Sequence, residues 1–250
     1  MNLSMRLIRS ATVTLHWNGF TLLVDPYLAD AGAGRSYGGE LRSPLVPLPL
    51  SLDELLRDVD AVFVSHLHSD HFDDAARETL PKSTWMLCPP DVAGGLRADG
   101  FTRVQAIDGQ WEHQGLRLRL TGGRHGPDAV LEDLGAVHGF VAQWDGGSLY
   151  WVGDSIFCPE VERTLAEARP AAVVVHACGA DWMGHGPIVM DCGMVEAVLR
   201  AAPAARVIAT HMDAVDHATV TRAQLRAHFG ALPALAQRLC IPADGERIAL

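Results

Sequence analysis

The amino-acid sequence predicts an α/β sandwich built from the whole chain, residues 1–250. Apolar segments of strand length alternate with helical segments in both halves of the chain, which is typical of sheets covered by helices. No polar low-complexity linker divides the chain, and no short repeat recurs in it. We therefore expect a single domain with a full hydrophobic core.

The first elements of this sandwich form a hairpin. Residues 11–17 and 20–25 are two apolar segments. They are joined by Asn18-Gly19, the preferred two-residue turn between antiparallel strands. Residues 29–50 follow as a Gly- and Pro-rich loop, and a loop of that length usually has a functional role.

A helix and a buried strand come next. Residues 51–58 begin with a capping box formed by Ser51 and Glu54, which predicts the start of a helix. Residues 61–65 ("AVFVS") are continuously apolar up to the final serine, as in a strand buried on both faces.

The later helices and strands are predicted in the same way, from the spacing of apolar residues and from the residues that begin or end an element. The expected helices are 73–80, 159–168, 191–202 and 221–229. The expected strands are 84–88, 116–120, 139–144, 148–153, 171–175 and 205–210. Thr221 and Gln224 form a second capping box, and Gly230 ends the last of these helices.

Composition limits the classes of function. A net charge of −10 argues against nucleic acid or an anionic membrane as a partner. Five cysteines without a C-x-x-C motif fit buried thiols in a reducing cytoplasm. The first ten residues lack the apolar core of a secretory signal, and no apolar run reaches the length of a membrane span. A cytoplasmic location is expected, and a homo-oligomer is compatible with the sequence.

The segment "SHLHSDH" carries the clearest chemical signal. His66 and His68 follow the buried strand 61–65 and, two residues apart, point to the same side of an extended chain. Asp70 and His71 lie just beyond them and can turn toward a second metal ion. Imidazoles with one or two carboxylates are typical ligands of zinc, although manganese and iron also accept them.

Three later strands end in the same way. Strand 116–120 leads to His125, strand 148–153 to Asp154, and strand 205–210 to His211. Open α/β sheets place their sites at the carboxyl ends of strands, so these side chains can meet the first motif. The sequence thus predicts a metal site.

The motifs "SHLHSDH", "GGRH", "WVGDS" and "ATHMD", in this order, resemble the metallo-β-lactamase superfamily. The likeness spans nearly the whole chain and is greatest for its lactonase-like branch, which includes ascorbate-6-phosphate lactonase and, more distantly, a phospholipase D. The segment "LLVDPYL" resembles the strand-Asp-Pro segment of that branch. The resemblance implies a four-layer αβ/βα sandwich with two mixed sheets and a dinuclear site between them.

The resemblance also implies a ligand set. His66, His68 and His125 would hold one metal ion, Asp70, His71 and His211 a second, and Asp154 would bridge both. Flavodiiron relatives usually have a glutamate where His68 stands, which favours a hydrolase over a redox protein.

The expected chemistry is metal-assisted hydrolysis. A hydroxide between two divalent ions is a nucleophile at neutral pH, and no serine elbow is present. Zinc is the first choice of metal, with Mn2+ or Fe2+ as alternatives. The substrate is expected to be a small ester, lactone or phosphodiester, and a locally cationic site would accept an anion. Asp70 and His185 are assigned to catalysis, His185 as proton donor to the leaving group.

Several polar residues are candidate substrate contacts. Arg35, Tyr37 and Arg42 come from the 29–50 loop, and Arg124 and His217 neighbour predicted ligands. The remaining histidines are interpreted as structural: His16, His113, His138, His176 and His228.

Two other functions compete with this interpretation. A non-catalytic metal-binding module would keep the same fold, but all seven ligand positions are filled. RNA processing is opposed by the acidic balance and by the lack of an appended RNA-binding segment.

Overall fold

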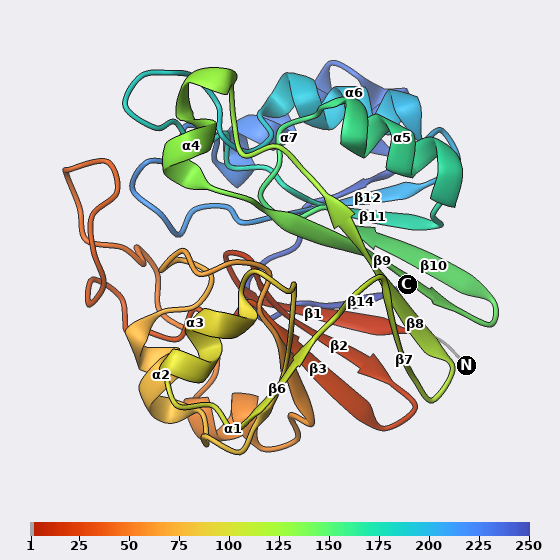
Figure 1. Ribbon diagram of the computed structural model, residues 1–250. Coiled ribbons are helices and arrows are strands. Elements are labelled where there is room, and N and C mark those ends of the chain that lie inside the picture. Colours follow the sequence, from red (N-terminus) through yellow and green to blue (C-terminus); the bar gives the residue numbers. More distant parts are fainter. Residues whose placement is uncertain (1–2) are drawn as a thin grey trace.

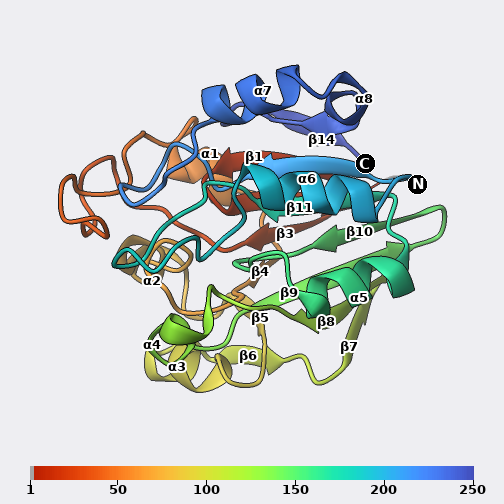
Figure 2. The same ribbon diagram turned by 90° about the horizontal axis from the view of Figure 1, so that it is seen from above.

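The computed structural model describes residues 3–250 of the chain. Two seven-stranded mixed sheets face each other, and helices cover the outer face of each (Figures 1 and 2). The predicted four-layer sandwich with two mixed sheets is confirmed.

The first sheet comes mainly from the N-terminal half. Its strands, in spatial order, are β14 (Arg247–Ala249), β1 (Ser4–Arg9), β2 (Thr12–Trp17), β3 (Phe20–Val24), β4 (Ala61–Phe63), β5 (Trp85–Cys88) and β6 (Arg103–Ala106). Strand β2 pairs antiparallel with β1 and β3, and β3 to β6 pair in parallel. Five strands, β1 and β3 to β6, therefore run in one direction.

The second sheet repeats this arrangement. Its strands, in spatial order, are β13 (Leu239–Cys240), β12 (Arg206–Thr210), β11 (Ala172–His176), β10 (Gly147–Trp151), β9 (His138–Trp144), β8 (Leu116–Gly122) and β7 (Gln110–His113). Strand β9 is antiparallel to both β8 and β10, and β10 to β13 are parallel. Strands β8 and β10 to β13 thus end at one edge.

Helices form the two outer layers. The helices are α1 (Leu52–Leu56), α2 (Asp74–Thr79), α3 (Ala93–Ala98), α4 (Leu131–Leu134), α5 (Pro159–Ala168), α6 (Cys192–Ala201), α7 (Arg222–Gly230) and α8 (Pro233–Ala236). Helices α1 to α3 lie on the first sheet and α5 to α7 on the second (Figure 1). Within residues 3–250, no helix combines the length and the apolar character needed to cross a membrane.

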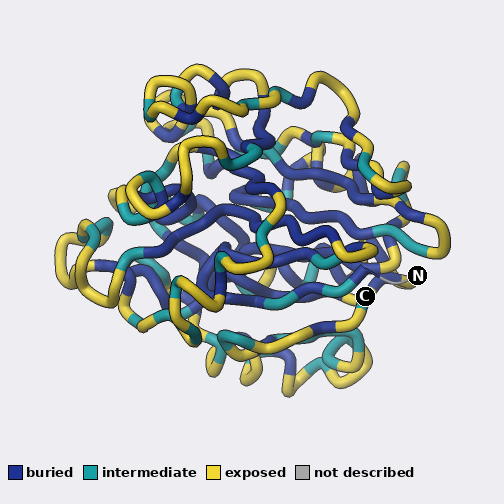
Figure 3. Tube along the Cα trace, turned by 90° about the horizontal axis from the view of Figure 1, so that it is seen from below, coloured by how far each residue is buried: buried dark blue, intermediate teal, exposed yellow. Residues whose placement is uncertain are grey.

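Three apolar cores hold these layers together. The largest fills the space between the sheets and contains Phe63, Phe140 and Trp151, with the last two rings stacked. The other two lie between each sheet and its helices. Figure 3 shows the buried residues along the central strands and the exposed ones on the outer segments. Strands buried on both faces explain the continuously apolar "AVFV" and "VVV" runs.

Local signals in the sequence correspond closely to the elements. Asn18 and Gly19 both have positive φ angles, of 48° and 81°, as the predicted hairpin turn requires. The capping boxes at Ser51 and Thr221 are present. Strands β1, β6, β7, β13 and β14 and helices α3, α4 and α8 were not predicted. Most are short, and β1 interleaves arginines with its buried residues, so neither period nor length marks them.

Candidate metal centre

The candidate ligands lie at the edge where the parallel strands of both sheets end. Strand β4 leads to "SHLHSDH", β8 to His125, β10 to Asp154 and β12 to His211. Gly153 delivers Asp154: its φ is +75°, and an added Cβ would lie 2.7 Å from the backbone oxygen of His138. Only glycine fits such a turn without strain.

Three further residues at this edge have left-handed backbone conformations. Ser10, Asp25 and His211 directly follow β1, β3 and β12, with φ angles of 57°, 46° and 60°. The backbone N–H of His211 donates to the carbonyl of Ser10 at 2.8 Å. Strained non-glycine residues of this kind concentrate at functional sites.

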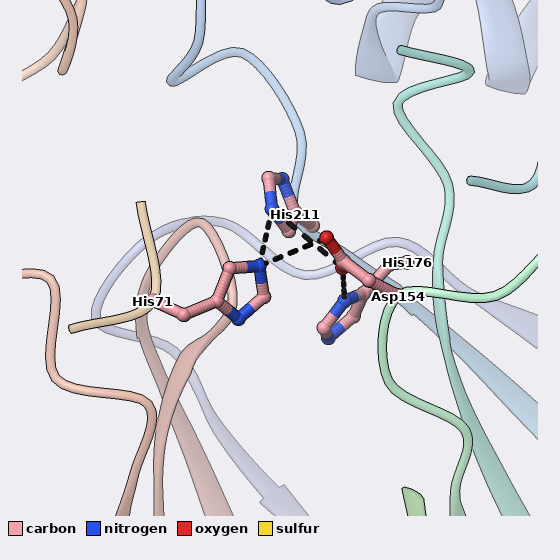
Figure 4. A group of neighbouring side chains, drawn as sticks. All are labelled: His71, Asp154, His176 and His211. Carbon is pink, nitrogen blue, oxygen red and sulfur yellow. Dashed lines mark hydrogen bonds and ion pairs between the residues drawn. The ribbon is translucent and has the colours of Figure 1, made fainter. Parts of the chain in front are cut away.

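Three groups of side chains lie close enough to hold ions, of which the third, Asp25 with His66 and His71, draws its histidines from the first two. In the first, one nitrogen from each of His66, His68 and His125 lies within 4.8 Å of the others. In the second, His71, Asp154, His176 and His211 satisfy the same criterion (Figure 4). These groups contain six of the seven predicted ligands, and the seventh, Asp70, is 3.5 Å from Nε2 of His211.

Distances in the second group are those expected of ligands around one ion. Two imidazole nitrogens that bind a tetrahedral zinc ion at about 2.0–2.1 Å lie roughly 3.3 Å apart. The Nε2 atoms of His71 and His211 are 3.2 Å apart. Oδ2 of Asp154 is 3.0 Å from Nε2 of His71, and 3.7 and 3.9 Å from Nε2 of His125 and His66. Asp154 therefore connects the two groups.

In four of the five buried histidines, Nδ1 is held from outside the cluster; in the fifth, His176, it contacts Asp154. Nδ1 of His71 is 2.8 Å from Asp25, and Nδ1 of His66 is 2.9 Å from Oγ of Ser65. Nδ1 of His125 is 2.9 Å from the carbonyl of Ile188. Nδ1 of His211 is 3.2 Å from Oγ of Ser10. Such contacts fix the tautomer and ring orientation of metal-binding histidines, leaving Nε2 for the ion.

One atom in particular requires a partner. Nε2 of His66 is buried, points into the cluster, and has no hydrogen-bond partner within residues 3–250. Buried polar atoms are almost always satisfied, so this nitrogen calls for a ligand that the protein does not supply. Together with the carboxylates of Asp70 and Asp154, the donor set fits divalent metal ions.

Electrostatics in the cluster favour positive charge. Burial by itself would raise the pKa of Asp154, but His71 and His211 hold it well below its usual value. Burial by itself would lower the pKa of His71, but the carboxylates of Asp154 and Asp25 have the larger effect and raise this pKa to about 10. In contrast, burial together with the neighbouring imidazoles lowers the pKa of His66 well below normal.

A cavity of about 470 Å³ opens onto these ligands. His68, Asp70, His125, Asp154 and His211 form its base. Its apolar lining consists of Leu67, Leu134, Ala180, Trp182, Ile188 and Val189. Its remaining lining residues are Arg35, Tyr37, Ser69, Asp74, Arg77, Asp133 and His217.

The structure brings only some of the candidate substrate contacts to this cavity. Arg35, Tyr37 and His217 line it. Arg42 donates instead to the carbonyls of Gly34 and Ala33, and Arg124 pairs with Asp128.

His185, the predicted proton donor, is likewise not brought to the cavity. It is exposed in the loop 181–187 and does not belong to the cavity lining. Glycines on both sides leave its side chain in solvent, and its backbone N–H donates to the carbonyl of Trp182. The structure therefore keeps the imidazole of His185 away from the candidate ligands.

Two residues of the cluster were missed. His176, interpreted as structural, is the last residue of β11, and its Nδ1 is 2.5 Å from Oδ1 of Asp154. Its neutral form is favoured, because burial lowers its pKa to about 4. Asp25 accepts hydrogen bonds from Ser65 and His71. Both residues lie at the carboxyl end of an apolar strand, and this position in the sequence could have identified them as members of the cluster.

Fold and site together define a class. Two seven-stranded sheets with histidines and aspartates gathered at their shared edge form an αβ/βα sandwich with a candidate metal centre. The chain belongs to the β-lactamase superfamily, whose domain profile matches residues 21–212. The predicted family is thus confirmed.

Similar proteins agree with this assignment. The UPF0173 protein YddR of Bacillus subtilis is 33% identical over 246 residues, 96% of each chain. The crystal structure of a possible metal-dependent hydrolase from Veillonella parvula has 30% identity and a TM-score of 0.95, with both chains fully covered. That of an isothiocyanate hydrolase from Delia radicum gut bacteria has 31% identity and a TM-score of 0.94, covering 100% of this chain and 99% of the other. The expected class of enzyme, a hydrolase of this superfamily, is confirmed.

Proposed function

We propose that the cluster binds two divalent metal ions, with zinc as the first choice and manganese or iron as alternatives. His66, His68 and His125 would hold one ion, and Asp70, His71 and His211 the other. Asp154 would bridge them, because its Oδ2 faces histidines of both groups. The single observation that carries this proposal is the convergence of Nε2 atoms whose rings are fixed through Nδ1.

Metal binding to this site should stabilise the folded protein. A ligand that binds only the folded state at 100 times its Kd contributes about 2.7 kcal/mol. For a chain of this size that corresponds to a rise in Tm of roughly 5–10 °C. Thermal unfolding of chelator-treated protein with and without added Zn2+ measures the shift. Equal Tm values in both samples would contradict the proposal.

The bound ions would lower the pKa of a coordinated water and polarise the substrate. The chain itself supplies a partly closed cavity, with apolar and polar residues in its lining, and fixed ligands. Asp25, Ser65 and Ser10 hold the imidazoles, so little reorganisation accompanies the reaction. The small volume fits a small-molecule substrate.

The charged residues of the cavity lining favour a small, uncharged electrophile. Of its two arginines, Arg77 is already paired with Asp99 and donates to the carbonyl of Phe72. Arg35 makes no ion pair within residues 3–250, and the carboxylates of Asp74 and Asp133 share the lining with it. A phosphodiester would need more cationic side chains near the metals. The shortage of free cationic side chains therefore favours isothiocyanates, lactones and esters over phosphodiesters as substrates.

An isothiocyanate is the first substrate class to test, because a relative covering the whole chain is an isothiocyanate hydrolase. The balanced reaction is R–N=C=S + H2O → R–NH2 + O=C=S, in which the C–N bond breaks and nitrogen receives the protons. Lactone or ester opening is the second candidate, supported by the same apolar lining.

Metal-saturated protein should be assayed with benzyl isothiocyanate, a γ-lactone, p-nitrophenyl acetate and bis-p-nitrophenyl phosphate. We expect turnover of one of the first three that disappears after chelation and returns with metal. Full metal loading without turnover of any substrate would instead favour the non-catalytic binding module.

A further inference from the structure

The carboxylate of Asp216 holds the middle of the 29–50 loop beside the cavity. Asp216, in the segment after β12, accepts hydrogen bonds from the backbone N–H groups of Tyr37 and Gly38 at 2.8 and 3.0 Å. It also accepts from the hydroxyls of Ser36 and Ser43. The backbone N–H of Asp216 donates to Oγ of Ser43 at 3.0 Å, completing a two-way contact.

The backbone of the loop packs tightly against the backbone of Asp216. A Cβ on Gly38 would lie 2.9 Å from the carbonyl oxygen of Asp216, so the loop approaches more closely than a side chain permits. The N–H of Leu45 donates to the carbonyl of Ala214 at 2.8 Å. The loop is therefore attached to the segment that begins with His211.

This attachment places the side chain of Tyr37 in the cavity lining. Its hydroxyl is 2.8 Å from Oγ of Ser69, which stands between the predicted ligands His68 and Asp70. Its ring lies 5.0 Å from the ring of His217, also a lining residue. Tyr37 thus reaches from a remote loop to the edge of the metal cluster.

The chemical state of this hydroxyl fits a donor. Burial, and then the charge of Asp70, raise the pKa of Tyr37 far above its usual range, so the phenol keeps its proton at neutral pH. The protonated hydroxyl can donate a hydrogen bond to a substrate in the cavity, and in the structure Oγ of Ser69 is its hydrogen-bond partner.

We infer that Tyr37 donates a hydrogen bond to the substrate atom that gains negative charge during hydrolysis, and that Asp216 positions it. The inference rests on the proposed hydrolysis at the metal cluster. For an isothiocyanate the accepting atom is the nitrogen or sulfur of the heterocumulene, and for an ester it is the carbonyl oxygen. Preorganised donors of this kind are a major source of rate enhancement.

The test compares Tyr37→Phe with Tyr150→Phe. Tyr150 is buried between the second sheet and its helices and does not line the cavity, so its variant makes the same chemical change outside the site. Thiocyanate, a linear N–C–S anion, is titrated into Co2+-loaded protein and followed by visible absorption. We expect its Kd to rise about tenfold in Tyr37→Phe, as for loss of a hydrogen bond to a charged group, and less than twofold in Tyr150→Phe.

Activity gives the second readout. With the substrate identified by the panel, Tyr37→Phe should lower kcat more than it raises KM, because the bond strengthens as charge develops. Equal thiocyanate affinity and equal kcat in Tyr37→Phe and wild type would overturn the inference. Absence of Co2+ absorption bands in the wild type would instead overturn the metal proposal, and this inference with it.

Asp216 requires its own variant. Asp216→Ala should release the loop, so that trypsin cleaves after the exposed Arg35 or Arg42 at least several-fold faster than in wild type. The same variant should weaken thiocyanate binding as Tyr37→Phe does, with Co2+ content unchanged. Asp60→Asn, which alters a carboxylate that accepts from the N–H of Thr21, is the matched control. Unchanged cleavage together with unchanged affinity would show that Asp216 does not position Tyr37.

Discussion

Replacing Asp154 by alanine is expected to empty the candidate metal centre and to reduce hydrolysis by at least about 10³-fold. Oδ2 of this side chain faces Nε2 of His66, His71 and His125 at 3.9, 3.0 and 3.7 Å. Alanine removes both the shared ligand and the negative charge that favours cations. Metal content by elemental analysis and turnover of the panel substrate measure the two effects.

Asp91→Ala is the matched control for this variant. Asp91 pairs with a histidine, His138, at 3.0 Å, but the pair lies outside the cavity and half of the Asp91 side chain is exposed. Its loss should change neither metal content nor turnover. An Asp154→Ala protein that keeps wild-type metal and activity would refute the assignment of Asp154 as the bridging residue.

Replacing Asp25 by asparagine should lower metal affinity by roughly 10–100-fold, although Asp25 is not one of the proposed ligands. Its carboxylate accepts from Nδ1 of His71 and from both the backbone and hydroxyl of Ser65. An asparagine amide can accept on one side only, so either His71 or Ser65 loses its partner. The expected cost in folding stability is about 1–3 kcal/mol.

Competition with a chromophoric chelator measures the affinity of Asp25→Asn, and thermal unfolding measures its stability. Asp60→Asn serves again as the surface control. If Asp25→Asn bound metal as tightly as wild type while losing stability, Asp25 would support the fold and not the ligands.

Much of the candidate site could be predicted, because its residues obey one local rule. His125, Asp154 and His211 each follow a predicted strand, and strands that run in the same direction place their carboxyl ends at the same edge. The "SHLHSDH" segment obeys the same rule after β4. Alternation of strand-like and helical segments likewise predicted the layers of the fold, since central strands of each sheet are buried on both faces.

His176 shows where that rule was applied too narrowly. It ends the run "AVVVH", so it was interpreted as interrupting a strand rather than ending one. The prediction ended this strand one residue too early. Because β11 extends to residue 176, the imidazole of His176 lies at the edge of the sheet beside Asp154.

The residues on the substrate side of the cavity are placed by contacts between distant parts of the chain, which no local sequence pattern reveals. Asp216 and Tyr37 are 179 residues apart in the chain, and nothing in "AVDHA" marks its aspartate as the anchor of a loop. The sequence identified 29–50 as a long loop but not its partner. The same holds for His185, whose Gly-rich surroundings suggested a role although the fold leaves it in solvent.

Metal content is the most direct test of the central proposal, that these histidines and aspartates form a dinuclear hydrolytic centre. Protein purified without chelator should be analysed for bound elements alongside His68→Ala and Asp154→Ala. We expect about two divalent ions per chain in the wild type, as in two-metal hydrolases, and a sharp fall in both variants. Wild-type protein that contains no metal and takes up neither zinc, manganese nor iron would contradict the account.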